Sequence, residues 1–149
     1  MPTRTADADL AQTSVALEHA VSWIRRALRP AGWNAIALST LDAVDRSGPL
    51  RITDLTVRER ITQPGMTGVV ARLESAGFVV RRSDPTDGRA TLVEATAVGR
   101  EFLRDIRRRR AETLARHLET LDPRHQRALA AAVEALEALA AQPIRHEGV

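Results

Sequence analysis

Hydrophobic residues recur at helical spacing near both ends of the chain. From about Ala8 to Leu28 they share one side of a helical wheel, which predicts a long first helix. The small, polar residues 1–7 are expected to fray. A second helix is predicted from about Asn34 to Arg46. Gly48 follows it, and glycine favours the left-handed conformation that often ends a helix.

The middle of the chain holds two shorter helical patterns close together. Residues 50–52 are expected to be extended, and Thr53 is the expected N-cap of a helix over residues 54–59. Thr62 is the expected N-cap of the next helix, which runs to about Gly77. A proline in its first turn is favourable, because that position needs no backbone N–H.

Two strands and two further helices complete the pattern. Residues 78–82 predict a strand, residues 83–88 have the composition of a turn, and residues 89–94 predict the returning strand. Thr96 is the expected cap of a long helix to about Leu121. An Asp-Pro pair then ends that helix and opens a last Ala- and Leu-rich helix to about Ala141.

This order of elements is that of a helix-turn-helix followed by a β-hairpin wing, a device for reading duplex DNA. The predicted fold is mainly α with a small β-hairpin wing, flanked by N- and C-terminal helices. The second helix of the pair fits the major groove, with its N-terminal residues near base edges. Gln63 can pair bidentately with adenine, and Thr67 can touch a thymine methyl group or a phosphate. Arg72, more than two turns along, is better placed for a phosphate or for bracing the wing.

Arginines gather on the predicted hairpin. Arg81, Arg82 and Arg89 lie on or beside it, and a guanidinium at a hairpin tip can enter a narrow minor groove. Asp87 lies two residues before Arg89 and is placed to orient it. The alternative for the hairpin alone is an exposed loop whose Arg and Asp residues pair for solubility. The two-helix module that precedes it favours DNA.

Composition agrees with one small domain. The chain has 149 residues, of which 44% are apolar and 3% aromatic, so its core must be modest and aliphatic. Dimerisation often adds stability to such a core. The formal net charge of +3 is weak evidence for a nucleic-acid partner. Every basic residue is Arg, whose planar fork matches phosphates and guanine edges, although a GC-rich genome explains much of that bias.

Several classes of function are opposed by what the sequence lacks. It has no cysteine, which excludes disulfides and Cys-ligated zinc. No apolar run resembles a membrane span or a secretory signal, so a cytoplasmic location is expected. No nucleophile–base constellation or phosphate loop stands out, and the four histidines lack ligand spacing. We therefore expect no enzyme, metal or cofactor. The Arg-rich run 107–110 is expected to be solvated or to form intersubunit salt bridges, with Asp105 and Arg109 as an i,i+4 pair.

Seven strings stand out at fixed places along the chain: Gly48-Pro49-Leu50, Thr53-Asp54-Leu55, Gln63-Pro64-Gly65-Met66-Thr67, Leu73-Glu74-Ser75-Ala76-Gly77-Phe78-Val79, Arg81-Arg82, Asp84-Pro85-Thr86-Asp87-Gly88-Arg89 and Thr96-Ala97-Val98-Gly99-Arg100. By these strings the chain resembles the multiple-antibiotic-resistance-regulator (MarR) family of winged-helix transcription factors. The resemblance covers nearly the whole chain. The fourth and sixth strings are fairly specific together, and either alone is weak.

The resemblance implies a homodimer and one domain over residues 1–149. Its dimerisation helices would lie at about 8–30 and 100–141, and its DNA-binding lobe at about 34–99. The helix from Thr62, with Pro64 in its first turn, would enter the major groove and Arg89 the minor groove. Two departures stand out. Family members often have a larger polar residue in place of Gly68, and Glu59-Arg60 replaces an apolar-Gly pair between the two helices, so that Arg60 would face a phosphate.

The same resemblance places Trp23 and Trp33 at a cleft that often takes small aromatic acids in such proteins. Arg46 is one candidate to bind an anionic ligand there. The alternative is that both tryptophans only pack at a dimer interface. The sequence therefore predicts a dimeric regulator, a repressor of a pseudo-palindromic operator, which a small ligand would release. Two other hypotheses are a winged-helix protein-interaction module that does not bind DNA and a small-molecule enzyme using the cleft.

Overall fold

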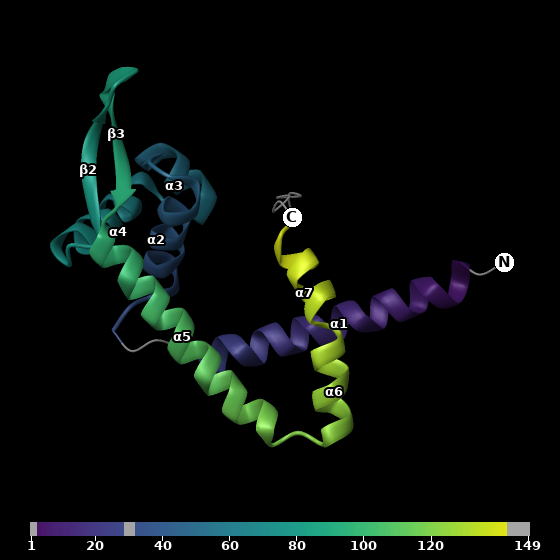
Figure 1. The fold of residues 1–149 in the computed structure, drawn as a ribbon. Helices are drawn as coiled ribbons and strands as arrows, with labels where there is room; N and C mark the ends of the chain where they lie inside the picture. Colours follow the sequence, from purple (N-terminus) through teal and green to yellow (C-terminus); the bar gives the residue numbers. More distant parts are fainter. Residues whose placement is uncertain (1–2, 29–31, 143–149) are drawn as a thin grey trace. The chain divides into compact units, whose positions relative to one another are not determined.

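The computed structural model describes residues 3–28 and 32–142. The chain divides into two compact units, Met1–Arg109 and Arg110–Val149, and one helix, α5, runs through the boundary (Figure 1). The first unit contains α1, α2, α3, α4 and a small sheet. The second contains the end of α5, then α6 and α7. The fold is therefore mainly helical, as the sequence predicts.

Helix α1 spans Thr3–Ala27 and starts earlier than expected. The prediction that the first seven residues fray is wrong for residues 3–7, and residues 1–2 lie outside the described part. Helix propagation through short Thr, Ala and Asp side chains costs little once a long helix exists. Residues 29–30 of the predicted N-terminal helix also lie outside the described residues.

Helix α2 spans Ala35–Ser47 and begins at a side-chain cap. The Asn34 Oδ1 atom accepts a hydrogen bond from the Ala37 backbone N–H at 2.8 Å. Gly48 ends the helix with φ 78°, a positive value that glycine adopts without strain. Its ψ of −161° lies outside the left-handed helical region, so the chain leaves α2 in an extended direction.

The helix-turn-helix consists of α3 (Ile52–Glu59) and α4 (Gln63–Ser75). Thr62 caps α4 as predicted, because its side-chain oxygen accepts from the Gly65 N–H at 3.3 Å. The predicted cap at Thr53 is wrong, since α3 already begins at Ile52. The two residues before it form strand β1 (Leu50–Arg51), so the helix starts directly where the strand pairing ends.

A three-stranded antiparallel sheet in the order β1-β3-β2 carries the wing. Strands β2 (Val79–Asp84) and β3 (Asp87–Ala95) are longer than the sequence predicts, and only Pro85 and Thr86 separate them. The tight turn is stabilised by Asp84, whose Oδ1 accepts from the Thr86 backbone N–H at 2.8 Å and from its hydroxyl at 2.6 Å. This local bonding shortens the six-residue turn expected from composition.

The core of the first unit lies among α2, α3, α4 and the sheet. Its largest fully buried side chains are aliphatic or Met, including Leu41, Leu55, Met66, Leu73 and Val93. An aromatic cluster packs against them. Phe78 stacks on Phe102 with centroids 4.2 Å apart, and Trp33 lies 5.3 Å from Phe78. Much of the chain's small aromatic content is therefore concentrated at one edge of this core.

Helix α5 (Ala97–Glu119) begins at the cap that the sequence predicts. The Thr96 Oγ1 atom accepts from the Gly99 N–H at 3.0 Å and donates to Gly77 O at 2.6 Å. Thr96 therefore joins the start of α5 to the turn after α4.

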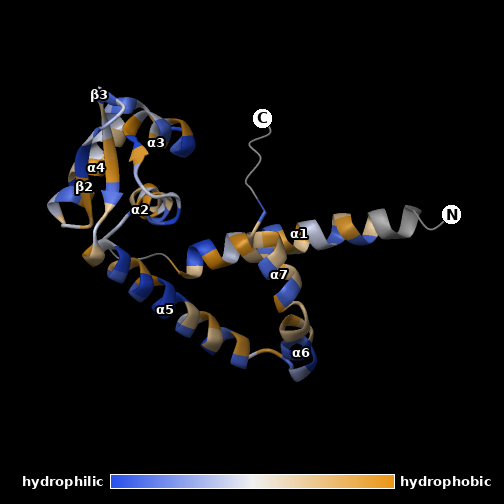
Figure 2. Cartoon of the chain, turned by 45° about the horizontal axis from the view of Figure 1, so that its top comes forward, coloured by the Kyte–Doolittle hydropathy of each residue, from blue (hydrophilic) through white to orange (hydrophobic). Residues whose placement is uncertain are grey.

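The last predicted helix is divided into α6 (Pro123–Ala131) and α7 (Val133–Ala140). The break lies at Ala132, whose N–H is shared between the carbonyls of Ala128 and Leu129, as in a tightened last turn. Neither helix has a buried residue. Figure 2 colours stretches of α1, α6 and α7 as hydrophobic. Four exposed large hydrophobic residues lie on α6 and α7: Leu129, Val133, Leu136 and Leu139.

Candidate nucleic-acid interface

Helix α4 has one buried and one exposed side. Met66, Val70 and Leu73 are fully buried, which fixes the rotation of the helix against the core. The predicted contact residues Gln63, Pro64, Thr67 and Arg72 are all exposed, as is the cap Thr62. The sequence pattern therefore identified the free side of this helix correctly.

The polar side chains on that side differ in how free they are. The Thr62 Oγ1 atom caps α4, and the Thr67 hydroxyl donates to Gln63 O at 2.9 Å, one turn back. Thr67 thus retains a methyl group and oxygen lone pairs for an outside partner. The Gln63 side chain makes no hydrogen bond to any residue that the structure describes. Its amide is therefore free to hydrogen-bond an outside partner from the first turn of α4, and base reading by Gln63 stays a prediction.

Arg72 is bound within the chain. Its guanidinium lies 4.7 Å from the centre of the Trp33 ring, and Nη2 donates to Gly32 O. It braces the residues before α2, so the predicted bracing of the wing is wrong. Helix periodicity places Arg72 on an exposed side but cannot show that Trp33 comes within reach. A phosphate contact by Arg72 stays a prediction.

The wing arginines fall into two groups. Arg81 pairs with Glu74 of α4 at 3.3 Å, and Arg82 pairs with Glu94 of β3 at 2.7 Å. The Arg89 guanidinium has no ion pair or hydrogen bond to the residues described here. All three are exposed. Both arginines of β2 thus have a direct acidic partner, whereas the Arg89 guanidinium has none among the described residues.

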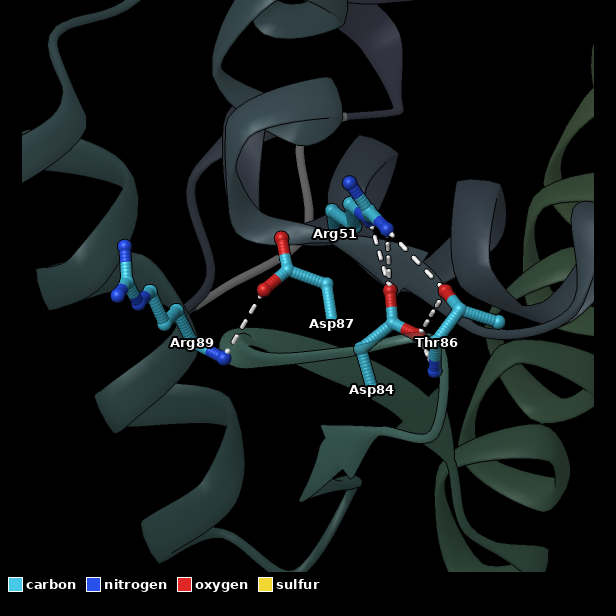
Figure 3. A network of polar contacts seen from close by, with 5 residues as sticks. All are labelled: Arg51, Asp84, Thr86, Asp87 and Arg89. Carbon is cyan, nitrogen blue, oxygen red and sulfur yellow. Dashed lines mark hydrogen bonds and ion pairs between the residues drawn. The ribbon is translucent and has the colours of Figure 1, made fainter.

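Asp87 holds the backbone rather than the side chain of Arg89. Its Oδ1 atom accepts from the Arg89 backbone N–H at 3.1 Å, and Figure 3 shows the Arg89 guanidinium pointing away from that carboxylate. Such a short-range bond stabilises the turn conformation. Asp87 therefore orients the backbone of Arg89 at the start of β3, and the expectation that it orients the guanidinium is wrong.

A second network at the wing was not expected from the sequence. Arg51 of β1 reaches Asp84 at the tip of β2, with Nε and Nη2 at 2.8 and 2.6 Å from Oδ2 (Figure 3). Asp84 is 6% exposed. Hydrogen bonds from Thr86, and then the Arg51 guanidinium, lower the pKa of Asp84 to about 2. Asp84 raises the pKa of Arg51 in turn. The Asp-x-Thr spacing indicates the turn, but the 33-residue separation hides the Arg51 contact.

The three residues predicted for a ligand cleft have separate surroundings. Trp33 belongs to the aromatic cluster with Phe78, Arg46 pairs with Asp42 at 2.8 Å, and Trp23 of α1 is 40% exposed. Trp33 and Arg46 thus each contact a residue of the first unit, Phe78 and Asp42 respectively. Their role in binding a ligand stays a prediction.

Arg107, the first residue of the Arg-rich run on α5, forms ion pairs with α2. Arg107 bonds to Asp42 and lies 3.6 Å from Asp45. Its side chain is exposed, as expected of a solvated residue, and its acidic partners lie on α2 of the same chain. The predicted i,i+4 pair of Asp105 and Arg109 is present at 4.0 Å. An α2 acid at that place could not be inferred from the helical pattern of α5.

Two other kinds of site are absent from residues 3–28 and 32–142. No helix there is both long and apolar enough to cross a membrane. No group of three His, Cys, Asp or Glu side chains there could hold a metal ion.

Comparison with known proteins agrees with this arrangement. Residues 31–90 match the model of the MarR family. The uncharacterized HTH-type transcriptional regulator Mb0904 of Mycobacterium bovis is 38% identical over 102 residues, which cover 68% of this chain and 71% of that protein. The chain also resembles two solved structures. The transcriptional regulator Tm0710 from Thermotoga maritima has a TM-score of 0.71 and 23% identity, over 87% of this chain and 94% of that one. BpsR of Bordetella bronchiseptica has a TM-score of 0.54 and 21% identity, over 89% and 93%.

The two structural matches show the shared fold, and the sequence relative shows the family. Its members are transcriptional regulators rather than enzymes. From its winged helix-turn-helix and these matches, the chain belongs to the MarR family of DNA-binding transcriptional regulators.

Proposed function

We propose that this regulator binds a pseudo-palindromic operator as a homodimer and represses transcription there. Each subunit would insert α4 into the major groove and Arg89 of the wing into the adjacent minor groove. The two half-sites would lie about one helical turn apart. The observation that carries this proposal is the exposed Arg89 guanidinium, which has no partner among the described residues, beside wing arginines that are already paired.

The proposed roles on α4 follow from its exposed side. Gln63 would read a base edge, because its amide is unengaged among the described residues. Thr67 would contribute mainly a methyl contact, since its hydroxyl already donates to the backbone. Thr62 and Pro64 would set the start of the helix rather than contact bases.

Dimerisation is supported by apolar side chains outside the core. On α1, Leu10, Val15 and Val21 are 66%, 56% and 52% exposed, and α7 exposes Leu139 at 52%. Exposed apolar surface of this kind is typical of an interaction surface. We propose that the helices at about 8–30 and 100–141 pair with those of a second copy.

Release from the operator would follow binding of a small ligand. The DNA binding of BpsR is regulated by 6-hydroxynicotinic acid, an aromatic acid. By analogy, Trp23, Trp33 and Arg46 would contribute to binding a ligand of this class. It must bind a spacing of the two α4 helices that mismatches DNA better than the matching spacing.

The direct test compares two arginines of the same wing. Operator fragments are first recovered by selecting genomic duplexes that the purified protein retains. In a titration at fixed salt, Arg89→Ala should weaken operator binding at least several-fold, whereas Arg82→Ala, which removes a paired arginine, should change it less. Light scattering should show both variants as dimers. Equal affinities for Arg89→Ala and the unmodified protein would refute the wing assignment.

A second variant tests base reading. Gln63→Ala should weaken binding to the operator more than to random duplex, because only the operator offers the base it reads. Equal losses on both duplexes would exclude base reading by Gln63. If the unmodified protein shows no salt-dependent binding to any duplex, a protein-interaction module becomes the better hypothesis.

A further inference from the structure

The turn between α3 and α4 carries an arginine in a conformation that normally selects glycine. Arg60 has φ 52° and ψ 42°, in the left-handed region, and it is the only non-glycine residue with positive φ in the described part of the chain. Its N–H donates to Val57 O and the Ile61 N–H to Thr56 O, both at 3.3 Å, which closes the end of α3. A side chain with a Cβ is strained there, and glycine is not.

The Arg60 side chain makes no polar contact within residues 3–28 and 32–142. Arg60 is exposed, and its guanidinium has no hydrogen bond or ion pair to any residue that the structure describes. The same holds for Arg58, two residues earlier. The acid between them, Glu59, accepts a hydrogen bond from the Ser39 hydroxyl at 2.8 Å, which holds its carboxylate toward α2. Arg58 and Arg60 therefore leave the positive charge of the turn without a direct partner among the described residues.

The position of the α3–α4 turn determines which part of a bound duplex the Arg60 guanidinium would contact. Arg60 precedes Gln63, the first residue of α4, by three residues, a reach of about 10 Å along the chain. When the start of α4 lies against base edges, the residues just before it border the sugar–phosphate backbone. A guanidinium binds a phosphate through charge-assisted hydrogen bonds.

We propose that Arg60 is a DNA-phosphate anchor, and that the chain retains a strained arginine at this turn for that contact. This proposal rests on the proposed function, because it needs α4 to lie in the major groove. It adds a contact outside both α4 and the wing. Since a phosphate carries no base identity, the contact should strengthen binding to all duplexes alike.

Three substitutions at one position separate charge from backbone strain. Arg60→Gly removes the charge and the strain, Arg60→Asn removes the charge with a residue that tolerates the left-handed region, and Arg60→Lys keeps the charge. Binding would be measured by fluorescence anisotropy on the selected operator and on a random duplex, from about 50 to 200 mM salt. Arg89→Ala is the reference variant, because the proposed function already assigns it a DNA contact.

The glycine and asparagine variants should each weaken binding about tenfold on both duplexes. The slope of log affinity against log salt should become shallower by about 0.9 for each arginine removed, or about 1.8 for a dimer on two half-sites. Arg60→Lys should keep most of the slope. The Tm of Arg60→Gly should rise by about 2–4 °C, which shows that weaker binding is not caused by unfolding.

The two proposals fail in different ways. If Arg89→Ala reduces the slope while Arg60→Gly and Arg60→Asn keep the slope of the unmodified protein, the phosphate anchor is wrong and the wing assignment stands. A weaker affinity for the operator alone would also overturn it, because a phosphate contact cannot distinguish sequences. Absence of salt-dependent binding by the unmodified protein would refute the proposed function itself.

Discussion

Gly99, the third residue of α5, is the position where one added methyl group should be most harmful. A Cβ built on Gly99 lies 2.1 Å from Phe78 O, 2.9 Å from Phe78 C and 3.1 Å from its Cα. Carbon atoms in contact normally stay about 3.5–4.0 Å apart. The obstacle is backbone, which cannot rotate away as a side chain can. Helix α5 and the start of β2 would therefore have to separate by about 1 Å.

That separation would disturb a set of short hydrogen bonds. Phe78 O accepts from the Thr96 N–H at 2.9 Å, and Thr96 bonds to Gly77 and Gly99 at 2.6 and 3.0 Å. Overpacking costs about 1–3 kcal/mol, and each lost hydrogen bond adds about 1 kcal/mol. We expect Gly99→Ala to lower the free energy of unfolding by about 2–4 kcal/mol, or the Tm by about 4–16 °C.

Gly68 provides the matched control, because it is also a helical glycine. A Cβ on Gly68 meets no atom within 4 Å, so Gly68→Ala should raise stability by about 0.5–1 kcal/mol through helix propensity. Both variants would be unfolded in denaturant and followed by circular dichroism at one protein concentration, since the proposed dimerisation would make stability depend on concentration. Equal stability of the two variants would refute the close approach of α5 to β2.

Two further predictions concern polar contacts of the DNA-binding lobe. Hydrogen bonds from Thr86, and then the Arg51 guanidinium, lower the pKa of Asp84 from 3.8 to about 2. The stability that this carboxylate adds to the wing should therefore be complete above about pH 4 and should be lost as the pH falls through about 2. NMR titration of the Asp84 carboxyl carbon checks this, and a midpoint near the ordinary value would contradict the network. For α4, a double-mutant cycle with Arg72→Ala and Trp33→Ala should give a coupling of about 0.5–1 kcal/mol in chemical unfolding. Additive effects of the two substitutions would show that the stacking contributes nothing.

The sequence predicts best those features that depend on neighbouring residues. Thr62 and Thr96 cap their helices as expected, because a capping hydroxyl bonds to a backbone N–H only three residues away. Thr53 has the same chemistry and is no cap. The residues before it pair with β3, some 40 residues later, as Arg51 does with Leu92. A local rule therefore failed where a distant strand decided where the helix begins.

The arginines show the same division at the DNA-binding surface. In the sequence, Arg81, Arg82 and Arg89 form one cluster of equal candidates. The structure distinguishes them by whether the guanidinium forms an ion pair. Glu74 of α4 pairs with Arg81, and Glu94 of β3 pairs with Arg82 across the hairpin. A surface ion pair contributes little stability, but an acid beside the guanidinium offsets its positive charge and so weakens its attraction for a phosphate. The density of arginines thus predicts where DNA would bind. In the proposed complex, an arginine whose guanidinium has no ion pair among the described residues, such as Arg89, would contribute most to the affinity.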